Sequence, residues 1–130
     1  MENFINVFIF IIYMFKIKAE ENSARVGVLD TRHGKIETPF FMPVATKLNV
    51  KLISPLDLRK LNVDAVIANA LLLYLKPGLD LVNKFNGVHK LMNFDGVIFT
   101  DSGGFQMISD NFLVSINEKS AKFRDPFTKK

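Results

Sequence analysis

The sequence has 130 residues, 48% of them hydrophobic, with 17 lysines and arginines against 13 aspartates and glutamates and a formal net charge of +4. These values suit one small domain with a modest core and exclude a wholly disordered chain. The absence of cysteine excludes a disulfide scaffold and a thiolate metal site within these residues, and with His33 and His89 as the two histidines we expect no metal centre. The mild positive charge suits a polyanionic partner such as RNA but does not establish one.

An apolar run from Val7 to Phe15 dominates the N-terminus. The run is shorter than the roughly 20 residues that span a bilayer, and it lacks the positive n-region and cleavage site of a secretory signal. Two interpretations stay open: residues 1–13 are a spurious gene-model extension before a natural start at Met14, or a first strand begins early. We expect residues 14–130 to form the domain and expect no membrane association, which cell fractionation would test.

A hairpin and an apolar run follow. Residues 26–29 and 35–37 predict two strands around a turn in which Gly34 supplies the positive φ. Beyond them, Pro39 and Pro43 bracket residues 40–42, Phe-Phe-Met, which are apolar on both faces. Such a run predicts a strand buried on both sides, as in a parallel sheet.

The next segment predicts a helix. Ser54 suits the N-cap, Pro55 the first helical position and Asp57 the third, which is the pattern of a capping box. The leucines at 56, 58 and 61 are then expected to face the core.

Strands and helices alternate over the rest of the chain. Residues 64–70 and 96–100 predict two more buried strands, and residues 79–85 predict a helix between them that presents residues 79, 82 and 85 on one face. This order predicts βα units and a parallel sheet. Residues 113–116 and 121–124 predict a final hairpin that turns at 117–119. We expect His89 at a helix end or loop, His33 in a solvated turn and Asp95 in a cap or turn.

The most informative stretch is residues 99–106, Phe-Thr-Asp-Ser-Gly-Gly-Phe-Gln. Asp101 directly follows a buried strand, where α/β folds place ligands, and the two glycines let backbone N–H groups approach a ligand closely. Phe105 offers a flat apolar surface and Gln106 an amide. The set suits a heterocycle better than a bare phosphate, because the lysine and hydroxyl of a phosphate loop do not follow. The alternative is an ordinary Asp-Ser-Gly-Gly turn.

Six short stretches of the sequence are each a weak match to a known family, but their order and spacing together make a strong match. They are Ala24–Gly27, Gly34–Pro39, Met42–Thr46, Leu75–Gly78, Leu91–Gly96 and Thr100–Gln106. With them, residues 24–127 resemble the first part of the tRNA-guanine transglycosylases, which exchange guanine in tRNA for a 7-deazaguanine through a covalent enzyme–RNA intermediate. The resemblance implies an α/β fold, an incomplete (β/α)₈ TIM-barrel with a leading β-hairpin.

The resemblance also implies roles for single residues. Asp101 would be the general acid/base and would bind the base. Phe105 would stack on the base, and Asn69 would donate a hydrogen bond to Asp101 and fix its rotamer. The remaining members of the implied base pocket are Ser102, Gly103, Gly104 and Gln106.

The sequence departs from the family pattern in two places. Residues 69–73 read Asn-Ala-Leu-Leu-Leu where the family has Asn-Thr-Tyr-His-Leu, so a hydroxyl, an aromatic ring and an imidazole are missing. The sequence also stops at Lys130, before the family's nucleophilic aspartate, its second base-reading aspartate and its zinc site. We therefore expect an N-terminal fragment or split half that does not exchange guanine alone, holds no metal or cofactor, and leaves zinc to the missing C-terminal part.

Three functional hypotheses follow from the resemblance. The Thr-Asp-Ser-Gly-Gly-Phe and Leu-Lys-Pro-Gly segments favour the queuine-type branch, which acts at the wobble guanine. The alternatives are an archaeosine-type enzyme acting at guanine 15, whose pattern is more often Asp-Ser-Gly-Ser-Phe, and a non-catalytic paralogue or fragment that binds tRNA or a catalytic subunit. The implied partners are tRNA, the 7-deazaguanine base, and a complementary C-terminal half or a homodimer partner, in the cytoplasm. A basic tail of Lys122, Arg124, Lys129 and Lys130 is solvated or contacts phosphate.

Overall fold

The computed structural model describes residues 14–108, 112–125 and 127. Most of the N-terminal apolar run falls at residues 7–13, outside this range, so the gene-model interpretation of residues 1–13 stays a prediction. Among the described residues, none of the helices has both the length and the apolar character needed to cross a membrane.

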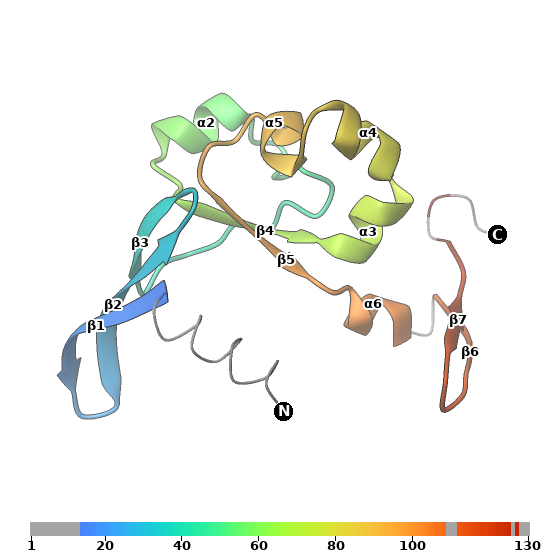
Figure 1. The fold of residues 1–130 in the computed structure, drawn as a ribbon, viewed down its shortest axis with the longest axis horizontal. Helices are drawn as coiled ribbons and strands as arrows, with labels where there is room; N and C mark the ends of the chain where they lie inside the picture. Colours follow the sequence, from blue (N-terminus) through green and yellow to red (C-terminus); the bar gives the residue numbers. More distant parts are fainter. Residues whose placement is uncertain (1–13, 109–111, 126, 128–130) are drawn as a thin grey trace.

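An antiparallel sheet of three strands opens the fold: β1 (Phe15–Glu21), β2 (Ala24–Thr31) and β3 (Gly34–Thr38), in that order (Figure 1). The predicted hairpin is confirmed, because β2 pairs with β3 from Gly27↔Thr38 to Thr31↔Gly34. β1 adds a strand that begins at Phe15. Ile36 of β3 is 2% exposed and packs with Ala65 and Val97, so this sheet is anchored to the strands that follow.

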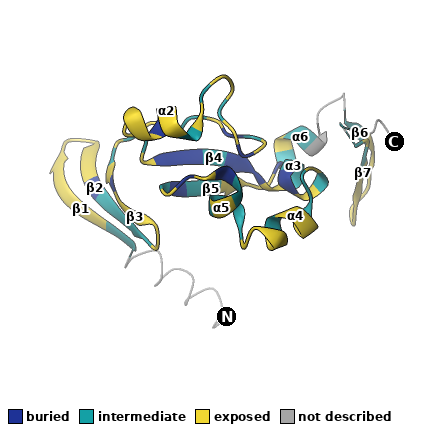
Figure 2. Cartoon of the chain, turned by 90° about the horizontal axis from the view of Figure 1, so that it is seen from above, coloured by how far each residue is buried: buried dark blue, intermediate teal, exposed yellow. Residues whose placement is uncertain are grey.

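Two parallel strands form the centre of the fold. β4 (Ala65–Asn69) and β5 (Val97–Asp101) pair in register from Ala65↔Val97 to Asn69↔Asp101, which confirms the predicted parallel βα arrangement. β4 is almost wholly buried, as its dark colour in Figure 2 shows. Short β-branched and small residues fill it because both of its faces are covered.

The predicted strand at residues 40–42 is wrong. Only Val44 bridges Ile67 in parallel, through Ala45 N–H to the Ile67 carbonyl at 2.7 Å and Ile67 N–H to the Pro43 carbonyl at 3.1 Å. Prolines on both sides of the run lack an N–H and fix φ, so regular pairing does not extend through it. Phe40 and Met42 pack against the core while Phe41 is 83% exposed.

The predicted capping box begins α2 (Pro55–Lys60). Asp57 N–H donates to Ser54 Oγ at 3.2 Å, and Ser54 N–H donates to Asp57 Oδ2 at 3.1 Å. Leu58 is 1% exposed, as expected, but the prediction is wrong for Leu56 and Leu61, which are 57% and 64% exposed. A helix of six residues turns only one of these leucines fully toward the strands.

Three short helices connect β4 to β5 and lie with α2 along one side of the strand pair in Figure 1: α3 (Ala70–Leu75), α4 (Leu79–Lys84) and α5 (Val88–Met92). The helix predicted from residue 79 is present as α4, and it holds no buried residue. His89 lies within α5. The sequence did not predict α3, α5 or α6 (Gly104–Ile108), which have only five or six residues each.

The predicted C-terminal hairpin is present as β6 (Leu113–Ile116) and β7 (Ala121–Phe123). Its turn is held by Asn117, whose Oδ1 accepts from the N–H groups of Lys119 and Ser120. The main core, between α2, β4, α3 and the end of α5, is a single cluster of buried residues: Ala45, Leu48, Leu58, Val66, Ala68, Leu73, Met92 and Phe94. The fold is thus a mixed α/β structure with several small sheets.

Candidate active site at the carboxyl end of β5

The two central strands end side by side in polar residues. Asn69 is the last residue of β4 and Asp101 the last residue of β5, and the parallel register places them opposite each other. α6 begins three residues after Asp101 and carries Phe105 and Gln106. The carboxyl ends of parallel strands are where α/β folds bind ligands, so this corner is the candidate site.

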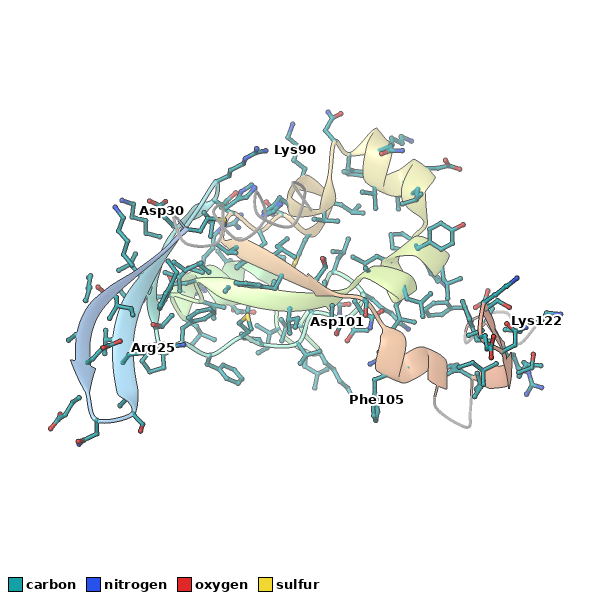
Figure 3. The ribbon with its side chains drawn as sticks, turned by 60° about the horizontal axis from the view of Figure 1, so that its bottom comes forward. Arg25, Asp30, Lys90, Asp101, Phe105 and Lys122 are labelled. Atoms are coloured by element: carbon teal, nitrogen blue, oxygen red, sulfur yellow. The ribbon has the colours of Figure 1, made fainter. Side chains whose placement is uncertain are left out.

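The Asp101 carboxylate has one fixed oxygen and one available oxygen. Its Oδ1 accepts hydrogen bonds from Asn69 Nδ2 and from the Gly103 N–H, both at 2.8 Å. Its Oδ2 has no hydrogen-bond partner within the described part of the chain, and the residue is exposed. Figure 3 shows the side chain at the end of β5, beside the start of α6. The carboxylate is therefore oriented but free to accept a hydrogen bond or exchange a proton through Oδ2.

Asn69 holds this carboxylate and also begins a helix. It is 3% exposed, and its Oδ1 accepts from the Leu72 N–H at 2.9 Å, which caps α3. Its Nδ2 donates to Asp101 and to Gln106 Oε1, the latter at 3.2 Å. The hydrogen bond to Asp101 that the resemblance implies is present. The sequence analysis missed the capping role, although an asparagine between a buried strand and an apolar run is a known helix-start signal.

The space around Gly103 leaves no room for a side chain. Its φ is +73°, and a Cβ there would lie 2.6 Å from Leu71 Cβ and 2.8 Å from Asn69 Oδ1. A side chain would therefore be strained and would push against the residue that orients Asp101. This close approach lets the Gly103 N–H reach the carboxylate.

The other residues of the predicted pocket lie on its outer side. Ser102 is exposed, and its Oγ accepts from the Gly104 N–H at 3.3 Å, at the start of α6. Phe105 is 80% exposed, and Figure 3 shows its ring pointing away from the ribbon. The structure thus joins Asn69, Asp101, Gly103 and Gln106 in one network and leaves Ser102 and Phe105 facing outward.

The remaining polar candidates lie elsewhere. Asp95 pairs with Arg59 of α2 at 3.2 Å, and His33 stacks on His89. Lys122 and Arg124 are exposed at β7, while Lys129 and Lys130 fall outside the described residues. In the described ranges no three histidine or acidic side chains come together to hold a metal ion.

Comparison with known proteins identifies the relatives. The family model described as queuine tRNA-ribosyltransferase matches residues 20–130. Two curated relatives, the queuine tRNA-ribosyltransferases of Staphylococcus haemolyticus (strain JCSC1435) and Staphylococcus aureus (strain JH9), are each 46% identical over 105 residues. The match covers 81% of this chain but only 28% of each relative, so the chain spans little more than a quarter of their length. On this evidence the chain belongs to the queuine tRNA-ribosyltransferase family.

Proposed function

We propose that the chain supplies the base-binding part of an enzyme that exchanges guanine in tRNA for a 7-deazaguanine, at the wobble guanine. The observation that carries this proposal is the Asp101 carboxylate, with Oδ1 held by two N–H donors and Oδ2 unpartnered among the described residues. Guanine carries N–H donors on its Watson–Crick edge, and a carboxylate is an acceptor for them. Family membership supports the same interpretation.

In this proposal Asp101 moves protons at the exchanged bases. When the bond between guanine and the ribose breaks, the departing base takes up a proton, and the incoming base gives one up. Phe105, exposed beside the carboxylate, stacks on the plane of the base. Ser102, Gly103 and Gly104 form the wall of the pocket, where small side chains let the base approach the backbone.

The rest of the reaction needs groups beyond those that the described residues bring together at this site. Covalent exchange requires a nucleophile at the ribose C1′. We assign that nucleophile, the second base-reading aspartate and the zinc site to the part of the family sequence beyond this match, in the same polypeptide or in a separate C-terminal half. The same part would add the strands that complete a (β/α)₈ barrel begun by Val44, β4 and β5. Acting on tRNA, the assembled enzyme would work in the cytoplasm.

A second candidate function is a non-catalytic subunit that binds tRNA or a catalytic partner. The observation in its favour is the apolar helix α3, in which Leu71 and Leu72 stand where the family pattern has tyrosine and histidine. These replacements remove two polar groups next to Asn69.

A chimeric enzyme tests both candidates. Residues 20–130 of this chain, which match the family model, replace the corresponding segment of the Staphylococcus aureus relative, and entry of labelled guanine into tRNA is measured in cell extracts that lack the native enzyme. The isolated chain serves as the background. We compare the chimera with its Asp101→Asn variant and with Asp80→Asn, which makes the same change in an exposed residue of α4.

We expect the chimera and Asp80→Asn to exchange guanine, and Asp101→Asn to lose on the order of 10²–10⁴-fold in rate. Equal rates for the chimera and Asp101→Asn would refute the proton-transfer role of Asp101. A folded chimera that binds tRNA without exchanging guanine would favour the non-catalytic subunit. Transfer RNAs changed at the wobble position or at position 15 identify the guanine that is exchanged.

A further inference from the structure

Two imidazole rings meet at the opposite end of β5 from Asp101. His33 lies in the turn between β2 and β3, and His89 lies in α5. Their ring centroids are 3.6 Å apart and their planes differ by 8°, so the rings are stacked. Figure 3 shows Lys90, the residue after His89, well away from Asp101. The stack therefore joins the tip of the first sheet to the body of the fold, outside the candidate active site.

The surroundings of His89 fit a neutral ring. Its Nε2 is buried and has no hydrogen-bond partner within the described residues. A buried Nε2 without a partner fits the bare nitrogen of a neutral imidazole, which carries no proton that needs an acceptor. A proton added at Nε2 would create a buried charged donor without an acceptor.

The charged groups around the ring come from each neighbouring segment. His33 faces it from the turn, Lys90 lies beside it on α5, and Asp95 follows α5; these residues, with Asn93 and Phe94, line a hollow of about 370 Å³. Asp95 favours a protonated ring, but Arg59 of α2 pairs with its carboxylate at 3.2 Å. Burial first, and His33 second, lower the pKa of His89, and they outweigh the opposing Gly96 carbonyl and Asp95.

We propose that the His33–His89 stack is an acid-sensitive latch, which holds the β2–β3 turn on α5 while the His89 ring is neutral and releases it when His89 takes up a proton at the buried Nε2. A proton at Nε2 places a charge in a buried position without an acceptor, so the protonated ring is driven toward solvent and its stack with His33 opens. The rest of the hairpin stays in place, because Ile36 is buried against Ala65 and Val97. Acid therefore opens the tip of the sheet and leaves its base attached.

The test uses the whole 130-residue chain and follows it by NMR between about pH 8 and about pH 5, the range in which histidine titrates. The imidazole signals of His89 should titrate below the ordinary midpoint of about 6.5. Amide exchange, corrected for the intrinsic effect of pH, should show a loss of protection in acid at the Thr31↔Gly34 end of the hairpin. The Gly27↔Thr38 end should keep its protection.

Two variants and a control separate the latch from general acid sensitivity. His33→Phe keeps a flat ring but removes the imidazole that lowers the pKa of His89, so the His89 midpoint should rise and the loss of protection in acid should shrink, because a phenyl face attracts a protonated imidazole. His33→Gln removes the ring, so the turn should be unprotected at both pH values. Asp30→Asn breaks the ion pair with Lys35 in the same hairpin and should behave like the parent. Equal turn protection at both pH values in the parent, or an unchanged acid effect in His33→Phe, would overturn the proposal.

Discussion

The hydrogen bond between Asn69 and Asp101 makes a quantitative prediction about stability. In Asn69→Ala, α3 loses its cap, which costs about 1 kcal/mol. The bond from Nδ2 to the Asp101 carboxylate is also lost; such bonds to charged groups contribute about 1.5–3 kcal/mol, and the exposure of Asp101 favours the lower end. We expect Asn69→Ala to lower the free energy of unfolding by about 3 kcal/mol, which corresponds to a fall in Tm of about 10 °C.

A double-mutant cycle isolates the bond itself. Urea unfolding of Asn69→Ala, Asp101→Ala and the double variant should give a coupling energy of about 1–2 kcal/mol. The cost of losing the cap cancels, because the cap is absent both from Asn69→Ala and from the double variant. Asn83→Ala removes the same side chain from an exposed position of α4 and should change stability by less than about 0.5 kcal/mol. A coupling energy below about 0.5 kcal/mol would refute the claim that Asn69 holds the carboxylate.

Three further predictions concern stability and are measured by urea unfolding. Gly103→Ala should lower the free energy of unfolding by about 3 kcal/mol, since the new side chain is strained in the left-handed backbone conformation and contacts Leu71 Cβ too closely. An unchanged free energy of unfolding would contradict the requirement for glycine at this position. Leu58→Ala should cost about 3 kcal/mol, whereas Leu56→Ala on the same helix should cost under about 0.5 kcal/mol, because only Leu58 is buried. The pKa of His89 is lowered in the fold, so the contribution of this ring to the free energy of unfolding is complete above about pH 6.5 and is lost as the pH falls through the lowered pKa. A free energy of unfolding that does not change with pH over this range would contradict the lowered pKa.

Helix caps and turns were predictable from the sequence, because their hydrogen bonds join residues that are close together along the chain. The capping box satisfies its donors within four residues, Ser54 to Asp57, so its pattern alone identifies the start of α2. Gly34 likewise sets the turn between β2 and β3, and Asn117 lies in the turn of the last hairpin. The residues from Asp101 to Gln106 are likewise contiguous and directly follow a strand, whereas their role as a base pocket stays a prediction.

Features that depend on distant packing were not predictable. Leu56 and Phe41 look like core residues, but they are exposed because the elements on their side do not cover them. α3 (Ala-Leu-Leu-Leu-Tyr-Leu) is apolar almost throughout and α5 has five residues, so neither shows the apolar periodicity that indicated α4. The partner of Asp101 is 32 residues away in the sequence, and the strand register brings it into place, so only the family resemblance indicated Asn69.

Because α3 is apolar, the β4–β5 register that places Asn69 opposite Asp101 is what orients the carboxylate. Leu73 is buried in the core, Leu71 lies against Gly103, and the backbone N–H of Leu72 donates to Asn69 Oδ1. None of these three contacts needs the tyrosine or the histidine of the family pattern, whereas the orientation of Asp101 needs Asn69 at the end of β4. The absence of these two polar side chains therefore leaves Asp101 hydrogen-bonded to Asn69. For that reason the comparison of Asp101→Asn with the unchanged chimera distinguishes a working base pocket from a binding subunit.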